Sequence, residues 1–256
     1  MIRLAVAKRS ASRLLRPEHG ASDFLDGVTL NRSMPLRDQI YAVVRRAIVA
    51  GSLPPGTVIN EIEIAEKLGL SRTPVREAVK KVSDEGLVDV HAQSGTFVAE
   101  INRSQVEEAY IVRIALECES VARAAPRMNE THKQNLEDII DRHSAALARG
   151  RFDEAIARDD DFHRYIAQIS GLIMLWKVVD TCKAQMDRCR ILTVPRPGHG
   201  TTTIEQHRAI LAALVTKKAR TAIAALRQHL DTSLDNSLTW FAERDTPEPQ
   251  VGSVQT

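Results

Sequence analysis

The sequence predicts a mainly α-helical protein, with a winged helix-turn-helix near the N-terminus and an all-helical bundle of six to seven helices after it. Three observations support this prediction. Aromatic residues make up only 4% of the 256 residues, which is low for a β-sheet protein because aromatic side chains favour strands. Apolar residues recur at helical spacing along most of the chain. Only two short runs, 87–90 and 96–100, have the composition of strands.

The region 35–98 is expected to form the winged helix-turn-helix. Its pattern predicts three short helices, over 36–50, 61–67 and 72–85, and then a small hairpin. Asn60 is suited to cap the second helix and Ser71 the third, because short polar side chains accept hydrogen bonds from the free amides of a helix N-terminus. Glycine follows each helix and ends it.

The region 99–241 is expected to form the helical bundle. Ser104 is suited to cap its first helix and Pro126 to end it. The expected helices span about 104–125, 131–148, 152–169, 172–192, 202–215 and 219–241, and 172–192 is interpreted as one long apolar segment. The segments outside the two domains, a basic arm over 1–34 and a tail over 242–256, are expected to be disordered.

The charge of the whole chain gives little information about its partners, since the formal net charge is only +2. A local cluster is more informative. Arg72, Arg76, Lys80 and Lys81 stand against the single Glu77 on one predicted helix, which favours a nucleic-acid partner.

The chain lacks the features of membrane and secreted proteins. No apolar run approaches the roughly 20 residues that a membrane-spanning helix needs, so no membrane partner is expected. The three cysteines form no metal-binding pair, and an odd number argues against a secreted disulfide framework. A cytoplasmic protein with reduced thiols is therefore expected.

The third predicted helix has the pattern of a DNA recognition helix. Arginines on its first turns can pair with guanine in the major groove or hold phosphates, and its lysines can contact the DNA backbone. A glycine at the hairpin tip allows close approach to DNA. The candidate DNA-binding residues are Ser71, Arg72, Thr73, Arg76, Lys80 and Gly95. The alternative is an ordinary amphipathic helix with a solvated basic face.

A second group of candidate residues lies in the helical region. Asp159 and His163 are four residues apart, so they lie on one face of a predicted helix and can bind one ion. His207 and His229 lie on two later helices. Three imidazoles and a carboxylate suit a divalent Zn, Ni, Mn or Fe ion, with positions left open for water or ligand. From spacing alone, a purely structural role for each histidine is the alternative.

The N-terminal region resembles the DNA-binding domain of the GntR family of bacterial transcription regulators. The resemblance covers about 35–98 and rests on PPG at 54–56, SRTPVREA at 71–78, EGLV at 85–88 and SGTFV at 94–98. It implies that Arg72 and Arg76 contact operator DNA and that Gly95 is the glycine of the wing. It also implies a protein of the bacterial cytoplasm, associated with the nucleoid.

The helical region resembles the FCD ligand-binding domain of the FadR subfamily, so the two resemblances together cover roughly 35–240. This resemblance implies a bundle of FCD type in which the family's metal-binding pattern is filled by Asp159, His163, His207 and His229. It implies that Arg113, in an R-x-x-LE segment, binds an effector carboxylate. An arginine with a buried stem and a solvated head group is the alternative.

The same comparison predicts which residues do not take part. Family members frequently carry Asn where this chain has Leu172. His132, His143 and His199 do not match the metal pattern and are expected on the surface. Asp160 and Asp161 are expected to be solvated, and the alternative is that either one replaces Asp159 as a ligand if the helix register is shifted.

Three classes of function are compatible with these patterns. The leading hypothesis is a ligand-responsive regulator, a repressor and no enzyme, that binds a two-fold operator as a homodimer and senses a small organic acid through a metal-containing domain. The rival is a metal-dependent enzyme that acts on a small carboxylate and has an attached DNA-binding domain. The third is a structural or adaptor protein with a vestigial metal site.

Overall fold

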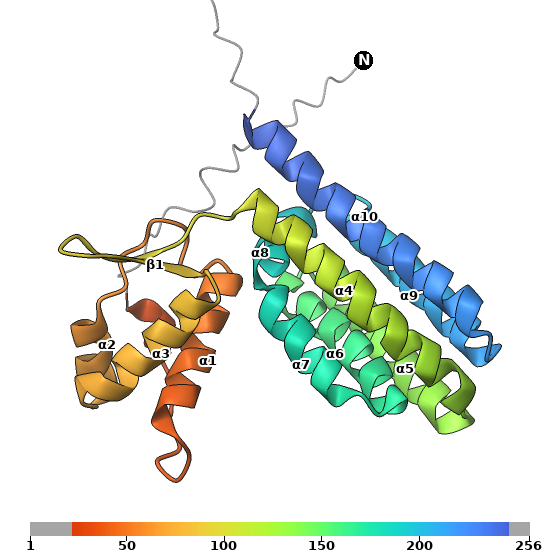
Figure 1. Cartoon of the computed structure of the whole chain (residues 1–256), viewed down its shortest axis with the longest axis horizontal. Coiled ribbons are helices and arrows are strands. Elements are labelled where there is room, and N and C mark those ends of the chain that lie inside the picture. Colours follow the sequence, from red (N-terminus) through yellow and green to blue (C-terminus); the bar gives the residue numbers. More distant parts are fainter. Residues whose placement is uncertain (1–21, 246–256) are drawn as a thin grey trace, which may run out of the picture. The chain divides into compact units, whose positions relative to one another are not determined.

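A computed structural model describes residues 22–245 of the chain. The chain divides between Ile101 and Asn102 into two compact units. The first is a small helical unit with a two-stranded sheet, and the second is a bundle of long helices (Figure 1). The predicted fold class, mainly α with a winged helix-turn-helix and a helical bundle, is confirmed.

Three α-helices and a hairpin form most of the first unit over residues 22–101. These elements are α1 (Leu36–Val49), α2 (Glu61–Leu68), α3 (Arg72–Asp84), β1 (Val88–His91) and β2 (Gly95–Val98). The strands pair antiparallel, with Val88 opposite Val98, and Val58 forms a bridge to Phe97. Apolar residues at helical spacing are buried between α1 and α3, among them Ile40, Val44, Val75, Val79 and Val82.

The structure contains one of the two predicted helix caps of this unit and lacks the other. The Asn60 side chain accepts hydrogen bonds from the amides of Ile62 (3.1 Å) and Glu63 (3.3 Å), so the predicted cap of α2 is confirmed. Ser71 occupies the N-cap position of α3, but its side chain makes no capping hydrogen bond. The expectation that the Ser71 hydroxyl caps the helix was wrong, and this exposed side chain is left without that local bond.

The segment before Pro35 was expected to be disordered, but the structure describes an ordered conformation over 22–34. A short 3-10 helix, η2 (Asp23–Leu25), buries Leu25. Lys67 fixes this segment with its ammonium, which lies 2.8 Å from the Ser22 carbonyl oxygen and 2.8 Å from Asp26 Oδ1. One apolar anchor and one lysine therefore order this segment, while the rest of the predicted basic arm, 1–21, lies outside the described residues.

Seven α-helices form the described part of the second unit. They are α4 (Arg103–Ala124), α5 (Glu130–Ala148), α6 (Phe152–Ser170), α7 (Ile173–Cys182), α8 (Ala184–Thr193), α9 (His199–Val215) and α10 (Ala219–Asp245). The long helices α4 and α10 pack along one another, and α6 packs against both α4 and α5 (Figure 1). The apolar core lies between them and includes Val121, Leu136, Phe162, Ile210 and Leu226.

Three helix boundaries in the bundle depart from expectation. The cap of α4 is Asn102, whose side chain accepts from the Gln105 amide at 3.2 Å, and Ser104 lies inside the helix. The segment expected as one apolar helix over 172–192 breaks at Lys183 into α7 and α8. Helix α9 begins at His199, three residues before Thr202.

The last helix also extends beyond its expected end. The structure has α10 continuing to Asp245, whereas 242–256 was expected to be disordered. An ion pair of 2.8 Å between Arg196 and Glu243 and the stacking of Arg244 on Trp240 account for this extension. The remainder of the predicted tail, 246–256, lies outside the described residues.

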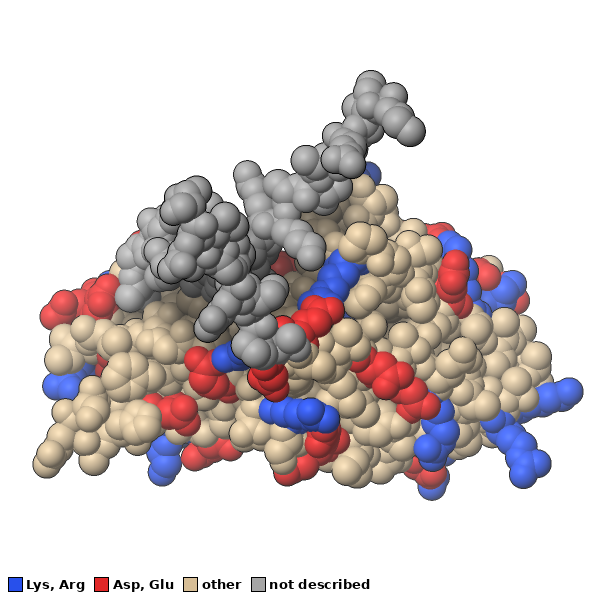
Figure 2. Space-filling view, turned by 90° about the horizontal axis from the view of Figure 1, so that it is seen from above, with Lys and Arg blue, Asp and Glu red and all other residues tan. Residues whose placement is uncertain are grey.

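The surface and the helix lengths agree with the composition. Basic and acidic side chains are interspersed on the face shown in Figure 2, as a formal net charge of +2 leads one to expect. Within 22–245, none of the helices is both long enough and apolar enough to cross a membrane.

Replacement of Asn60 tests the cap of α2. Asn60→Ala removes the acceptor of two amides and is expected to lower the free energy of unfolding by about 1 kcal/mol. Ser71→Ala is the matched control, because that side chain makes no cap bond, and a change below about 0.5 kcal/mol is expected. Urea unfolding of the full chain followed by circular dichroism measures both. Equal losses in the two variants would contradict this assignment of the caps.

Candidate functional site

Helix α3 presents the candidate DNA-binding residues on one exposed face. Val75, Ala78, Val79 and Val82 are buried against the rest of the unit. The opposite side of the helix carries exposed Arg72, Thr73, Arg76 and Lys80, and Ser71 directly before it is also exposed. The helix is therefore fixed by its apolar side and leaves its polar side accessible, as insertion into a groove requires.

The basic residues of α3 differ in their local partners. Arg76 Nε lies 3.5 Å from Glu61 Oε2. The ammonium of Lys81 lies 3.6 Å from Asp38 and 3.9 Å from the centroid of the Tyr41 ring, so Lys81 is held within the unit. These contacts distinguish Lys81 from the other basic side chains of the exposed face.

Gly95 lies at the first residue of β2, where the hairpin turns. Its φ of +122° falls where L side chains are strained, so glycine is required here. A Cβ at this position would also lie 3.5 Å from the Phe97 ring. The exposed backbone at the hairpin tip is thus free of a side chain.

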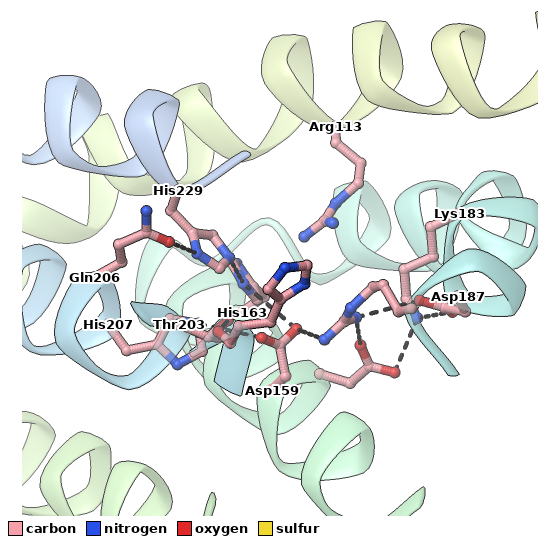
Figure 3. A network of polar contacts seen from close by, with 12 residues as sticks. Arg113, Asp159, His163, Lys183, Asp187, Thr203, Gln206, His207 and His229 are labelled. Carbon is pink, nitrogen blue, oxygen red and sulfur yellow. Dashed lines mark hydrogen bonds and ion pairs between the residues drawn. The ribbon is translucent and has the colours of Figure 1, made fainter. Parts of the chain in front are cut away.

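Three helices of the bundle bring the four predicted metal ligands together. Asp159 and His163 lie on α6, His207 on α9 and His229 on α10, and all four are buried. One ligand atom from each residue lies within 4.8 Å of the others. Figure 3 shows the histidine rings and the carboxylate converging on one point from different helices.

Two neighbouring side chains orient the histidine rings. Glu117 Oε2 lies 2.7 Å from His163 Nδ1, and Gln206 Oε1 lies 3.1 Å from His229 Nδ1. Both rings therefore direct Nε2 into the cluster, where these two nitrogens are 3.2 Å apart. Fixing one ring nitrogen so that the other faces a metal is the usual role of such outer partners.

The donor atoms of the cluster fit a divalent cation. His207 Nε2 lies 3.3 Å from Asp159 Oδ1. The two atoms are close enough for an ion pair, but they are not aligned for a hydrogen bond. Burial lowers the pKa of His207 and lowers that of His229 well below its usual value, and this favours the neutral ring that a metal ligand requires. Buried imidazoles and a carboxylate with so few hydrogen bonds are the chemistry of a metal site.

The carboxyl of Asp159 stays ionised despite its burial. Burial opposes ionisation, but the Arg190 guanidinium and the His207 ring hold the pKa of Asp159 well below its usual range. Arg190 Nη2 lies 2.7 Å from Asp159 Oδ2. The cluster thus contains an anionic ligand at neutral pH.

Arg113 reaches the same site from α4. It is 1% exposed, and its Nε donates to Glu117 Oε1 at 2.6 Å. The alternative of a head group in solvent was wrong, because the side chain points into the bundle (Figure 3). Arg113 therefore lies beside the cluster and is linked to it through Glu117.

A pocket lined mainly by polar and charged residues adjoins Arg113 and the cluster. Its empty volume, counted with its opening to solvent, is about 540 Å³. Apart from Ile156, Val194 and Gly200, its walls are polar or charged: Arg113, His143, Asp159, Arg190, Thr193, His199, Thr203, Gln206, His229, Thr232, Ser233 and Asn236. Such a lining suits a small polar anion better than an apolar ligand.

Comparison with known proteins identifies both units. Residues 36–98 match the model of bacterial regulatory proteins of the gntR family, and residues 108–232 match the FCD domain. The HTH-type transcriptional repressor RspR of Escherichia coli strain K12 is 31% identical, in an alignment that covers 84% of this chain and 97% of that protein. The chain belongs to the GntR family.

Two further proteins align with this chain over most of their own length. An HTH-type regulator from Streptomyces ambofaciens, from an unstable DNA locus, is 30% identical over 78% of this chain and 84% of that protein. The solved structure of E. coli McbR/YncC superposes with a TM-score of 0.72 at 22% identity, covering 81% of this chain and 99% of that one. At 22% identity, the comparison with McbR/YncC supports the fold only.

Several residues of this FCD site escaped the sequence analysis. His143 was expected on the surface, but it is 3% exposed, its ring lies 5.5 Å from that of His207, and burial lowers its pKa to about 4. His132 and His199 are only half-buried. Glu117 lies four residues after Arg113, a helical spacing that could have indicated the pair.

A buried ion network beside the cluster was also missed. Lys183 binds Asp160 at 2.8 Å and Asp187 still more closely, so the expectation that Asp160 is solvated was wrong. Asp161, likewise expected in solvent, pairs with Arg158 at 2.6 Å. The segment that includes Lys183 and Asp187 was interpreted as apolar, although Lys183, Asp187 and Arg190 stand at helical spacings that could have indicated their pairing.

The Arg113–Glu117 pair makes a testable contribution to stability. Glu117→Gln leaves the buried Arg113 uncompensated and is expected to cost about 3 kcal/mol or more. The matched control on the same helix is Glu119→Gln, which removes an exposed pair with Arg123 and is expected to cost less than about 1 kcal/mol. Chemical denaturation of the full chain compares the two variants.

The pH dependence of this pair follows from the pKa of Glu117. Burial opposes ionisation, yet Arg113 and His163 lower the pKa from 4.5 to about 2. The stabilisation from Glu117 is therefore present above its ordinary pKa and is lost as pH falls toward about 2. If the difference in unfolding free energy between wild type and Glu117→Gln stays constant over this pH range, the assignment is contradicted.

Proposed function

We propose that the chain is a ligand-responsive repressor of transcription, active in the bacterial cytoplasm on nucleoid DNA. As a homodimer it binds a two-fold operator and senses a small organic acid through the metal-binding FCD domain. The observation that carries this proposal is a pocket lined by the buried Arg113 together with Asp159 and His229, two members of the four-residue cluster. That the related protein RspR is named a repressor supports the direction of regulation.

The DNA-binding role rests on the exposed face of α3. Arg72 and Arg76 lie on its first turns, where arginine can donate two hydrogen bonds to guanine, and Thr73 lies between them. Ser71 and Lys80 contact phosphates, which set affinity and salt dependence more than sequence choice. Gly95 brings the wing backbone close to DNA, and two such units in a dimer match two half-sites.

The metal-binding role rests on the four cluster residues. Asp159, His163, His207 and His229 would hold a divalent Zn, Ni, Mn or Fe ion. When bound, such an ion supplies positive charge that attracts a carboxylate. Arg113 adds a second positive group in the same pocket, and a guanidinium can bind both oxygens of a carboxylate.

Signalling requires that the acid bind unequally to two states of the protein. An acid that binds the DNA-competent and DNA-incompetent states equally does not shift the equilibrium between them. The ligand and DNA affinities are then coupled reciprocally.

The rival enzyme hypothesis needs a general base near the metal. Glu117 is a carboxylate outside the cluster that contacts one of its histidines, but it is engaged by both Arg113 and His163. An engaged carboxylate orients ligands rather than accepting a proton from water. This arrangement favours reversible binding of the acid.

Removal of the two arginines tests the DNA-binding face. The double variant Arg72→Ala with Arg76→Ala is expected to weaken binding to fragments selected by the wild-type protein by about 2 kcal/mol or more. Fluorescence anisotropy over a range of salt concentrations measures it. Arg149→Ala, an exposed arginine at the end of α5, is the control and keeps the affinity. Unchanged binding by the double variant would refute this assignment of α3.

Metal content tests the cluster. Protein purified without chelator is expected to carry about one divalent ion per chain, and the double variant His207→Ala with His229→Ala is expected to lose it because two of four ligands are gone. Elemental analysis by mass spectrometry gives the metal-to-protein ratio. His132→Ala, a histidine outside the cluster, is the control. An equal metal content in the ligand and control variants argues against the site.

A further inference from the structure

Helix α10 presents a stripe of polar side chains to the pocket beside the cluster. His229, Thr232, Ser233 and Asn236 all line this pocket. They follow one another at intervals of three, one and three residues, so they lie on one face of the helix. At a rise of about 1.5 Å per residue, this face extends roughly 10 Å along the helix axis from His229 to Asn236. Hydroxyl and amide groups therefore continue from a cluster ligand along the pocket wall.

Helix α9 lines the same pocket with further uncharged polar groups. Thr203 and Gln206 are three residues apart on this helix and both belong to the wall. Gln206 Oε1 lies 3.1 Å from His229 Nδ1 (Figure 3), and Gln206 Nε2 donates to the Thr232 hydroxyl oxygen at 2.8 Å. The side chains of the two helices are thus joined where the stripe leaves the cluster.

The α10 stripe keeps hydrogen-bonding capacity for a ligand. The Thr232 hydroxyl donates to the Gln228 carbonyl oxygen at 2.8 Å, so its hydrogen is already used within the helix. Farther from the cluster, the side chains of Ser233 and Asn236 have no hydrogen-bond partner within the described residues. A serine hydroxyl and an asparagine amide can each both donate and accept. Both are therefore available to a polar group in the pocket.

His143 lines the pocket from α5 and is an independent sign of a polar ligand. The residue is 3% exposed, and its Nδ1 makes no hydrogen bond in the part of the chain that the structure describes. Buried polar groups in folded proteins are usually paired, and an unpaired one calls for an explanation. A pocket that receives a polar ligand group beside this ring supplies one.

Hydroxyl groups match this lining better than an alkyl chain or a second carboxylate does. An alkyl chain would leave the polar wall unpaired, which is costly. A carboxylate only accepts hydrogen bonds and brings a charge. The arginines of the wall, Arg113 and Arg190, lie at the cluster end of the network, since Arg190 contacts Asp159 at 2.7 Å and Arg113 is linked to the cluster through Glu117. A hydroxyl donates and accepts without a charge.

We propose that the acid sensed by this pocket carries several hydroxyl groups on its carbon chain, as an aldonic acid does. Ser233 and Asn236 bind these hydroxyl groups, while the carboxylate is bound as in the proposed function. The inference rests on that function, because it concerns the acid bound by the same pocket. It makes Ser233 and Asn236 the residues that determine specificity, a role separate from that of the cluster.

Calorimetry with six-carbon acids tests the ligand class. The full chain loaded with Zn²⁺ is titrated with gluconate, galactonate and mannonate, and with hexanoate and adipate, which have as many carbons but no hydroxyl group. At least one of the three hydroxylated acids is expected to bind about tenfold or more tightly than both hexanoate and adipate. Binding of hexanoate or adipate that is as tight as that of every hydroxylated acid overturns the inference.

Variants of α10 test the assigned residues. Ser233→Ala removes a hydroxyl, and Asn236→Leu replaces an amide by an apolar side chain of similar size. Each is expected to weaken binding of the preferred hydroxylated acid about fivefold or more, while the affinity for Zn²⁺, measured against a fluorescent chelator, stays near that of the wild type. Thr239→Ala and Gln228→Leu are the matched controls, because both residues are exposed on α10 and do not line the pocket.

The ratio of affinities separates recognition from a structural role. Loss of hydroxyl recognition lowers the affinity for the hydroxylated acid and leaves that for hexanoate unchanged, whereas a disturbed pocket lowers both equally and overturns the assignment. Thermal unfolding establishes that each variant is folded at the assay temperature, and Asn236→Ala replaces Asn236→Leu if the latter is not.

The outcomes also distinguish this inference from the proposed function. If the zinc-loaded protein binds acids of the panel without preferring a hydroxylated one, the inference is wrong while acid sensing stands. If it binds none of the five acids and none of their four-carbon counterparts butanoate, threonate and succinate, acid sensing itself fails.

Discussion

The buried carboxylate of Asp159 is the constraint on which the rest of the bundle site depends. An ionised carboxylate that is 1% exposed is tolerated only with close positive or hydrogen-bonding partners. Arg190 supplies one side of that compensation, and the cluster of histidines lies on the other. The neighbouring helices are therefore required to bring polar groups, rather than apolar ones, to this part of the core.

The same requirement extends outward from the cluster. His163 and His229 are useful as ligands only if each ring is held in one orientation, and Glu117 and Gln206 provide this from α4 and α9. Gln206 in turn donates to Thr232 at 2.8 Å. Each step in the network thus fixes the next, so the cluster is preorganised by groups that do not themselves face its centre.

The sequence predicts the DNA-binding unit better than the bundle site for a physical reason. Helix caps and the exposed face of α3 depend on residues near one another in the chain, and Asn60 and Arg72 were correctly placed by local pattern. The buried position of Arg190 depends on Asp159, which lies on another helix. Pairing of charges across helices leaves no local signal, so the contact of Arg190 with Asp159 and the burial of His143 were not predicted. The four cluster residues were recognised through resemblance, because their helical spacing alone is common.

Sensing in a helical bundle requires that a ligand change how helices interact, and the apolar core is poorly suited to this. Contacts such as those of Phe162 are numerous and non-directional, and close packing resists gradual deformation. The polar network instead joins α4, α6, α8, α9 and α10 through a few directional contacts, some of which share an acceptor. A carboxylate that two donors share can keep one donor and lose the other. Such an exchange of hydrogen-bond or ion-pair partners is a change between two distinct arrangements. The polar network is therefore where a small ligand can bias the arrangement of the helices, and its position at their centre connects one binding event to most of the bundle.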